Sequence, residues 1–342
     1  MTEIKQETRK LDHIELALRS QMNRHEQDRR FYYEPLFKAH PTDETDISLN
    51  FLGKKLNAPL WISSMTGGVG PARHINQNLA RICHEYGLGM GLGSCRVLLE
   101  DDSYLKDFNL RAILGPDLPL FANLGISQIE ELLTSNSYEQ KLNDLISKLD
   151  ADGLIVHINP LQEWFQPEGD RLKNSPLVTL TKLCEVFKHK LIIKEVGQGL
   201  GPRSLEALLD LPIAGIELAA FGGTNFTKLE QLRGDMALIN PLSNVGHTAV
   251  EMVSMLNSLV GKKSEYKNKQ IIISGGLETI LDGFYLLENL KFTSVIGQAK
   301  NFLTHAENYQ DLKCFTENQI NSLKSAKSFL VAKPIADHGE LR

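Results

Sequence analysis

The chain contains eight short apolar segments that end in small or polar residues and alternate with stretches of helical spacing. They comprise residues 58–66, 87–93, 119–125, 153–159, 191–197, 215–222, 271–276 and 293–299. Their apolarity is continuous rather than alternating, as parallel strands buried on both faces require. A series of eight such units predicts an α/β fold, a TIM (β/α)8 barrel.

The stretches between these segments are predicted to be the helices of the barrel. They comprise residues 74–86, 127–149, 176–188, 203–210, 246–260 and 278–289. Helical spacing is clearest where Leu205, Leu208 and Leu209 share one side. The alternative, an open doubly wound sheet, would more often have about six strands and a GxGxxG turn after the first, and this chain lacks that turn.

Residues 1–57 precede the barrel and are predicted to belong to the same domain as the barrel itself, residues 58–342. A length of 342 residues suits one barrel of this class, and no linker rich in Pro, Gly or Ser divides the chain. Within this arm, residues 1–45 begin with an amphipathic helix that contains Leu11, Ile14 and Leu18.

A β-hairpin is predicted over residues 47–57, with its turn at Gly53, Lys54 and Lys55. It lies directly before the first barrel strand. We therefore expect it to cap the floor of the barrel.

Composition excludes several classes of protein. The net charge of −5 gives no attraction to nucleic acid or to anionic membranes. The four cysteines are far apart and form no CxxC pair, which argues against a zinc site or disulfide framework. No signal-peptide core and no apolar run of about 18 residues is present. A soluble, cytoplasmic protein is expected.

Polar residues follow nearly every predicted strand, where barrel enzymes place their chemistry. They are Ser64 and Thr66, on either side of Met65, at the end of the first strand, Ser94 and Arg96 after the second, Asn123 in the third, His157 and Asn159 in the fourth, Lys194 in the fifth and Thr224 after the sixth. Period-two alternation places Ser94 with Arg96, and His157 with Asn159, on one face each. Any single one of these is more often a turn residue, a helix cap or a structural histidine, so their convergence carries the prediction.

Lys194 is the hardest of these residues to explain structurally. It follows Leu191, Ile192 and Ile193 within a strand, so its ammonium must reach the barrel mouth or remain a buried, unpaired charge. Residues 274–276 and 297–299 end the last two strands with small residues that favour a phosphate site. A flat cofactor with a phosphate tail fits such a mouth, and FMN is the candidate, with Lys194 beside its N1/C2=O edge.

Together these residues resemble a known family, the type 2 isopentenyl-diphosphate isomerases. The similar motifs are RKLDHI (9–14), SMTGG (64–68), GSCR (93–96), ANLG (122–125), HINPLQEWFQPEGD (157–170), KEVGQG (194–199), GGTNF (222–226) and SGG (274–276). They occur in family order from Arg9 to about Ala299. The resemblance implies interconversion of isopentenyl and dimethylallyl diphosphate, with reduced FMN, Mg²⁺ and NADPH or another reductant, in isoprenoid biosynthesis.

The resemblance also implies site residues. FMN would contact Ser64, Met65, Thr66, Ser94, Asn123, Lys194, Thr224, Gly275, Gly276 and Ala299. The diphosphate would be bound by Arg9, Lys10, Arg96, His157 and Asn159, with Mg²⁺ on Glu163 and Gln162 beside the alkene. Arginine forks and a carboxylate-bound Mg²⁺ match a diphosphate electrostatically. Reduced flavin would serve as the acid/base, Gln162 would orient the substrate, and family members commonly form tetramers or larger oligomers.

The chain departs from the family pattern after the seventh strand. Leu277 and Glu278 stand where Ile-Arg is frequent, so a cation for the FMN phosphate is missing, and Lys300 is the candidate to replace it. Phe226 stands where Trp is frequent.

Two other functions remain open. An FMN-dependent 2-hydroxy-acid oxidase would share Lys194 and the phosphate loops, and His247 could supply its base. It also needs paired arginines late in the barrel, and after His247 the first arginine is Arg342. A barrel without catalytic activity would gain nothing from a charged mouth.

Overall fold

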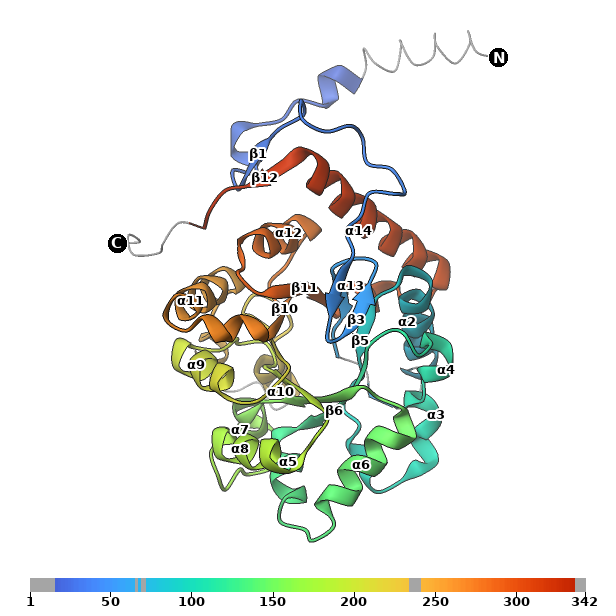
Figure 1. The fold of residues 1–342 in the computed structure, drawn as a ribbon, viewed down its shortest axis with the longest axis vertical. Coiled ribbons are helices and arrows are strands. Elements are labelled where there is room, and N and C mark those ends of the chain that lie inside the picture. Colours follow the sequence, from blue (N-terminus) through green and yellow to red (C-terminus); the bar gives the residue numbers. More distant parts are fainter. Residues whose placement is uncertain (1–15, 65–66, 69–71, 234–240, 336–342) are drawn as a thin grey trace.

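The computed structural model describes residues 16–64, 67–68, 72–233 and 241–335, and its centre is a closed barrel of eight parallel strands (Figure 1). The strands follow one another around the barrel in chain order: β4 (Leu60–Ile62), β5 (Gly89–Gly91), β6 (Leu120–Gly125), β7 (Gly153–His157), β8 (Lys190–Lys194), β9 (Gly215–Glu217), β10 (Gln270–Ser274) and β11 (Thr293–Gln298). The pairing of β11 with β4 closes the ring. Each strand falls within or overlaps one of the eight apolar segments, so the predicted TIM barrel is confirmed.

Helices surround the strands, as βα units require (Figure 1). The longer ones are α2 (Ala72–Tyr86), α6 (Tyr138–Leu149), α8 (Pro176–Val186), α9 (Pro202–Asp210), α11 (Ala249–Lys262), α12 (Ile280–Asn289) and α14 (Tyr309–Phe329). The shorter ones are α3 (Leu105–Phe108), α4 (Arg111–Leu114), α5 (Ile126–Leu132), α7 (Pro160–Phe165), α10 (Phe226–Arg233) and α13 (Lys300–His305). Leu205, Leu208 and Leu209 of α9 are buried as predicted.

The prediction of one helix over residues 127–149 is wrong. The chain forms α5 and α6 with a turn over residues 133–137 between them. This turn contains Ser135 and Ser137, whose hydroxyls hydrogen-bond to each other at 2.9 Å. Serine side chains offer the backbone local hydrogen-bond partners outside a helix, which favours a break at this point.

The predicted hairpin is present as β2 (Leu49–Phe51) and β3 (Lys54–Leu56), but its turn lies one residue earlier than expected. Lys54 pairs with Phe51, so the turn residues are Leu52 and Gly53. Both have positive φ, 52° and 80°, the backbone that a two-residue hairpin turn requires.

The hairpin covers the end of the barrel at which the strands begin. The amide of Leu52 donates to Gln270 Oε1 at 2.6 Å, and Lys190 Nζ donates to the carbonyl of Leu52 at 2.6 Å. Gln270 and Lys190 are the first residues of β10 and β8, so the turn is fixed across the barrel floor.

An ion-pair network joins the hairpin to the chain before β7. Asp152 lies 2.5 Å from Lys54 Nζ and 2.8 Å from Arg111 Nη2, and it also accepts from the amide of Leu120. Burial alone would raise the pKa of Asp152, but the hydrogen bonds from Lys54, Leu120 and Arg111 outweigh it and hold the pKa below its usual value. Asp152 therefore stabilises the fold at neutral pH, and this contribution is lost as the pH falls through the depressed value.

Outside the barrel, β1 (Phe31–Tyr33) pairs with β12 (Leu330–Ala332) in a small antiparallel sheet that the sequence pattern does not predict. Of the predicted N-terminal helix, Leu11 and Ile14 lie outside the described residues, and Leu18 is exposed in a short helical turn. No helix in the described ranges is long and apolar enough to cross a membrane.

Replacing Asp152 with Asn should destabilise the fold, because Lys54 and Arg111 lose the carboxylate that they share. We expect the free energy of unfolding to fall by about 2 kcal/mol, less than for a fully buried ion pair because Asp152 and Lys54 are partly exposed. Chemical denaturation at pH 7 measures this change. Asp210→Asn is the matched control, since the Asp210–Lys263 pair is about half-exposed and should contribute much less. Equal losses in the two variants would contradict the importance of the floor network.

Candidate active site

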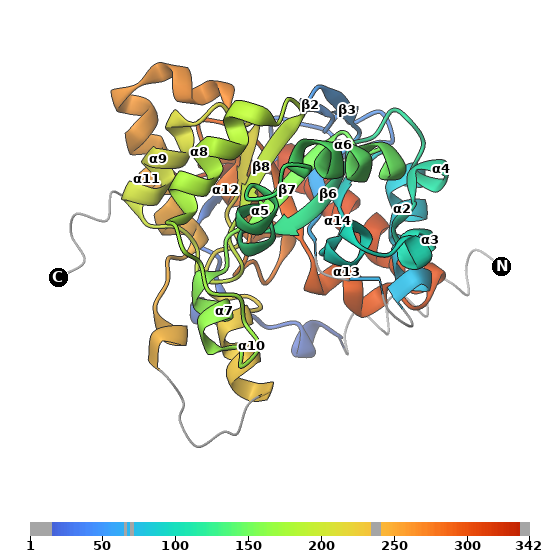
Figure 2. The same ribbon diagram turned by 90° about the horizontal axis from the view of Figure 1, so that it is seen from below.

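The carboxyl ends of the barrel strands meet at the end opposite the hairpin, where α7 and α10 project from the barrel (Figure 2). A cavity of about 520 Å³ opens there. Its walls come from the ends of β4, β8, β9, β10 and β11 and from the loops that follow them. This volume lies within the range of about 300–1,000 Å³ that small-molecule sites occupy.

Lys194 ends β8 and lines this cavity, as its sequence context predicts. It is only 8% exposed, and its Nζ donates to the carbonyl of Glu195 at 2.8 Å. Its strand neighbour in register is Glu217 of β9, and Nζ lies 3.7 Å from Glu217 Oε1. The buried ammonium therefore has a carboxylate beside it.

Glu217 was not among the predicted site residues, although the same signal marks it. It stands in the apolar segment 215–222 as Lys194 stands in 191–197, and it is completely buried. Its Oε1 accepts from Ser274 Oγ at 3.2 Å. A charged residue inside an apolar segment is thus the sequence signal that marks both Lys194 and Glu217.

Several buried polar atoms around the cavity lack a hydrogen-bond partner. They are Ser63 Oγ, Ser64 Oγ, Glu217 Oε2 and Gln298 Oε1. Buried polar atoms without partners are costly in a folded protein. Their concentration on the walls of one cavity marks it as a binding site for a polar ligand.

His157 lies at the end of β7, next to Lys194 in the register of β7 and β8. Its Nδ1 is 2.8 Å from Asn123 Oδ1, and Asn123 Nδ2 donates to the carbonyl of Leu92. The Asn123 amide thus presents its oxygen to the ring, so Nδ1 carries the proton. Burial and then the charge of Lys194 lower the pKa of His157 to about 4, which keeps the imidazole neutral at physiological pH.

Asn159 is not in the strand, as the period-two argument assumed, but is the N-cap of α7. Its Nδ2 donates to Glu163 Oε1 at 2.9 Å and to Gln162 Oε1 at 3.2 Å, and its Oδ1 is buried without a partner. Glu163 is buried, and its Oε2 accepts from the amide of Asp170 at 2.9 Å. The helix α7 therefore holds Asn159, Gln162 and Glu163 in one hydrogen-bonded group.

The period-two argument also fails for Ser94 and Arg96. The strand β5 ends at Gly91, and Arg96 begins a short 3-10 helix. Both side chains are exposed, and Arg96 Nη1 lies 3.2 Å from Asp170 Oδ2. Arg96 and Glu163 are thus both held by Asp170, through its side chain and its backbone.

A further carboxylate that the sequence analysis missed lies on α10. Glu230 is 3% exposed, and its Oε1 accepts from Arg233 Nη1 at 2.9 Å and from Gln162 Nε2 at 3.4 Å. It lies in the segment 223–245, where the sequence shows no apolar strand and gave no reason to single it out. Trp164 on α7 is 65% exposed, with the guanidinium of Arg171 5.0 Å from its ring centre.

The loops after β10 and β11 form the glycine-rich part of the cavity. Gly275 has φ +86°, and a Cβ at this position would overlap the backbone of Ala220. The close contact of the loop after β10 with the loop after β9 therefore requires glycine here. Asp282 Oδ2 accepts from the amides of Glu278 and Thr279, at 2.8 and 2.6 Å, and Asp282 Oδ1 accepts from Arg30 at 2.6 Å. The chain's own carboxylate thus occupies two amides that closely follow residues 274–276, the segment expected to bind a phosphate.

The structure brings together only part of the predicted site. The predicted flavin contacts that line the cavity are Ser64, Lys194, Thr224, Gly275, Gly276 and Ala299. Those that do not line it are Ser94 and Asn123. Asn159 and Gln162 line a second, largely apolar cavity of about 750 Å³ beside α8 and α9. Predicted residues outside the described part of the chain are Arg9, Lys10, Met65 and Thr66.

Within the described residues, no group of three or more His, Cys, Asp or Glu side chains could hold a metal ion. The four cysteines are free thiols, and Cys83 and Cys95 are buried.

No protein-family model matches the chain. Named relatives match it over most of its length. The isopentenyl-diphosphate delta-isomerase of Rickettsia rickettsii (strain Sheila Smith) is 34% identical over 322 residues, which cover 91% of this chain and 89% of that protein. The protein of the same name from Rickettsia typhi is 34% identical over 282 residues, covering 80% of this chain and 79% of that protein.

Solved structures share the fold at low sequence identity. A flavocytochrome b2 variant superposes with a TM-score of 0.59 at 13% identity, covering 87% of this chain and 72% of that one. A lactate oxidase from Pediococcus acidilactici gives 0.58 at 14% identity, covering 89% and 84%. At this level of identity the likeness concerns the barrel fold alone.

His157 should titrate far below an ordinary histidine. We expect its imidazole to gain a proton near pH 4 instead of 6.5, so the fold loses stability as the pH falls from about 6.5 to about 4. NMR of the histidine ring protons, assigned with His157→Gln, measures the titration. Lys194→Met should raise the midpoint, since it removes the second cause of the shift. A wild-type midpoint near 6.5 would contradict the enclosed, neutral state.

Proposed function

The chain belongs to the isopentenyl-diphosphate delta-isomerase family, in its type 2, TIM-barrel form, and we propose that it interconverts isopentenyl and dimethylallyl diphosphate with reduced FMN as cofactor. The observation that carries the proposal is the sequence identity to the named isomerases along most of the chain. The cavity at the carboxyl ends of the strands supports it. The enzyme is then an isomerase of isoprenoid biosynthesis.

The residues of the cavity fit FMN. Its unpartnered buried oxygens and the ammonium of Lys194 supply polar contacts for a flavin ring, and the glycine-rich loops after β10 and β11 supply a place for a phosphate. The proposed contacts are Ser64, Met65, Thr66, Ser94, Asn123, Lys194, Thr224, Gly275, Gly276 and Ala299. When bound and reduced, FMN would supply the acid/base that moves a proton to and from the substrate. NADPH is the proposed reductant.

The diphosphate is proposed to bind on the side of the mouth formed by the loops after β5 and β7. Arg9, Lys10, Arg96, His157 and Asn159 are the proposed ligands. Arg96 is exposed and held by a single acidic partner, so exchange of Asp170 for a diphosphate oxygen needs no change of fold. Because Nδ1 carries the one proton of the neutral imidazole, Nε2 of His157 would donate to the diphosphate only after the ring takes up a second proton, which a nearby anion favours.

Glu163 is the proposed Mg²⁺ ligand. Each of its carboxylate oxygens accepts one hydrogen bond and keeps further lone pairs. The unpartnered Oδ1 of Asn159 lies in the same hydrogen-bonded group and offers another hard oxygen. Mg²⁺ often binds one or two carboxylates with phosphate oxygens and water completing its shell, which suits a site that holds a diphosphate.

Gln162 is proposed to orient the substrate's alkene. Its amide is itself positioned by two partners, Asn159 and Glu230, and so has a defined direction. Gln162 and His157 are the proposed catalytic residues, and Glu230 would hold Gln162 in place. Trp164 and Phe165, next to Gln162 on α7, are proposed to close over the hydrocarbon part.

We further propose a cytoplasmic homo-oligomer, a tetramer or larger, in which residues 1–57 and 58–342 form one domain. Oligomerisation is favoured by the exposed apolar residues of the arm, among them Tyr33, Leu36 and Phe37. A complex of this kind needs neither nucleic acid nor a membrane.

The second candidate function is that of a 2-hydroxy-acid oxidase, because the solved structures that share the fold of this chain include a lactate oxidase. His247 is partly buried at the end of a loop whose backbone pairs with Gln198 and Phe221. The paired arginines that would clamp a carboxylate late in the barrel are absent from the sequence before Arg342. The isomerase is therefore favoured.

The direct test incubates isopentenyl diphosphate with the protein, FMN, Mg²⁺ and NADPH under argon and follows the product by NMR. We expect dimethylallyl diphosphate to form without a matching loss of NADPH. If no product forms although flavin is bound and reducible, the isomerase proposal fails, and 2-hydroxy acids become the substrates to test.

Replacing Glu163 with Gln should weaken the Mg²⁺ requirement without affecting the flavin. We expect half-maximal isomerase activity to need about tenfold more Mg²⁺ or higher, because a neutral amide attracts the cation less than a carboxylate does. Activity against Mg²⁺ concentration measures the shift, and flavin absorbance shows that FMN stays bound. An unchanged Mg²⁺ dependence would remove Glu163 from its proposed role.

Replacing Lys300 with Gln should weaken the binding of FMN but not that of riboflavin, which has no phosphate. Lys300 and Lys194 are the basic residues that line the described cavity, and Lys300 follows β11, in the part of the lining that also includes the acidic Glu278. We expect the dissociation constant of FMN to rise about fivefold, the size of an exposed charge pair, while that of riboflavin stays constant. Fluorescence titrations measure both ligands. Glu278→Gln should strengthen FMN binding, because it removes a negative charge from the cavity lining. Lys291→Gln is the control, since Lys291 is exposed on another loop. Equal effects on both ligands would place Lys300 away from the phosphate.

A further inference from the structure

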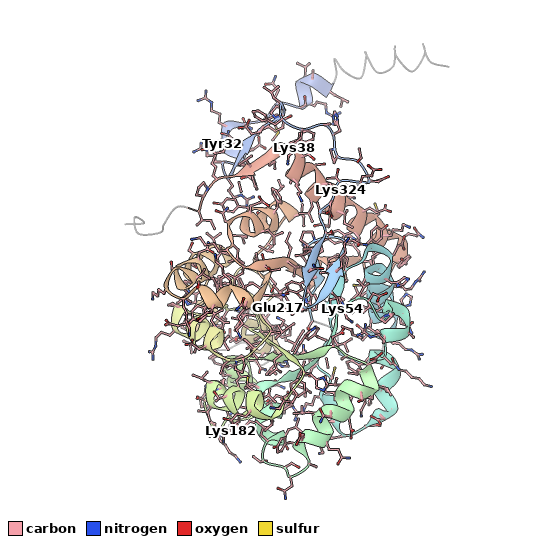
Figure 3. All side chains as sticks on the ribbon, in the orientation of Figure 1. Tyr32, Lys38, Lys54, Lys182, Glu217 and Lys324 are labelled. Atoms are coloured by element: carbon pink, nitrogen blue, oxygen red, sulfur yellow. The ribbon has the colours of Figure 1, made fainter. Side chains whose placement is uncertain are left out.

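Three residues on adjacent strands form a row across the inside of the barrel mouth. Lys194 of β8 is in register with Glu217 of β9, and Ser274 of β10 donates its hydroxyl to Glu217 Oε1 at 3.2 Å. The same Oε1 lies 3.7 Å from Lys194 Nζ. Glu217 therefore stands between a cation and a hydroxyl donor, inside the ring of barrel strands (Figure 3).

Burial of these charged side chains costs folding free energy. Glu217 is completely buried, Lys194 is 8% exposed, and Glu217 Oε2 has no hydrogen-bond partner. A buried ion pair commonly stabilises a protein no more than apolar residues of similar size would. A charged pair kept in such a place, with one oxygen unsatisfied, is more typical of a functional site than of a structural one.

The position of the row indicates what it acts on. All three residues line the cavity proposed for FMN, and Lys194 is the residue proposed to lie at the flavin N1/C2=O edge. A lone lysine there would attract the negative charge that a flavin gains on reduction. A carboxylate 3.7 Å from the same ammonium offsets that attraction, because charges at this separation interact strongly in a buried site.

We infer that Glu217 is a positioning residue for Lys194 that holds the lysine ammonium at the cofactor cavity and limits how much negative charge the cavity accepts. The inference rests on the proposed FMN cofactor. Its consequence is a lower reduction potential of the bound flavin than Lys194 alone would give. Ser274 supports the carboxylate from its other side.

The test is the midpoint potential of bound FMN, measured by dye equilibration during anaerobic reduction. Glu217→Gln keeps the shape of the side chain and an oxygen for Ser274, but removes the charge. We expect it to favour reduced over oxidised FMN at least tenfold, which is about 30 mV more positive for a two-electron couple. Lys194→Met should shift the potential the opposite way.

The double variant Lys194→Met/Glu217→Gln removes both charges of the pair. Its potential should lie between those of the two single variants and close to that of the wild type, because the two opposite shifts offset each other. Glu217→Asp keeps the charge and should stay closer to the wild type than Glu217→Gln does. Glu130→Gln is the control, since Glu130 is a buried carboxylate outside the cavity and should not move the potential.

The outcomes distinguish this inference from the proposed function. If the wild-type protein takes up no FMN, the proposed cofactor fails before any potential is measured. If FMN binds and Glu217→Gln leaves the potential unchanged or lowers it, Glu217 has no such role, although the cofactor stands. If Glu217→Gln fails to fold, the comparison of Glu217→Asp and Lys194→Met with the double variant decides, and the absence of opposite shifts overturns the inference.

Discussion

Every strand of the barrel is covered on both faces, so a polar side chain can remain in a strand only where it meets a partner or an opening. This constraint explains where buried charges occur at the two ends of the barrel. At the floor, Asp152 meets Lys54 and Arg111 where the hairpin covers the ends of the strands. At the mouth, Lys194 meets Glu217 where a cavity begins. The first group is fully satisfied by the protein, whereas the second leaves oxygens without partners.

The sequence was sufficient for the barrel because continuous apolar segments have few other uses at this length and spacing. It was insufficient wherever a single residue decides the local geometry. The hairpin turn lies at Leu52 and Gly53 because strand register, set by packing on the barrel, decides which residues face each other. The break between α5 and α6 depends on serine hydroxyls that compete with the helix backbone.

The site was predictable in its strand-borne part and less so in its loops. Lys194 follows from its apolar neighbours, and Glu217 would have followed by the same argument. Asn159 and Arg96 lie beyond the strand ends, so alternation along a strand says nothing about where they point. Glu230 reaches Gln162 through the contact of α10 with α7, a contact between segments about 70 residues apart that no local pattern contains.

The carboxylate of Asp282 links two regions that are distant in sequence. One oxygen holds the amides of Glu278 and Thr279 beside the cavity, and the other receives Arg30 from the N-terminal arm. A shortened form of the chain that begins after Arg30 would keep every residue of the barrel. It would nevertheless leave the Asp282 carboxylate without its cationic partner, next to the loop proposed for the cofactor phosphate. The arm thus supplies a positive charge that offsets an acidic residue beside the mouth, although it contains no strand of the barrel.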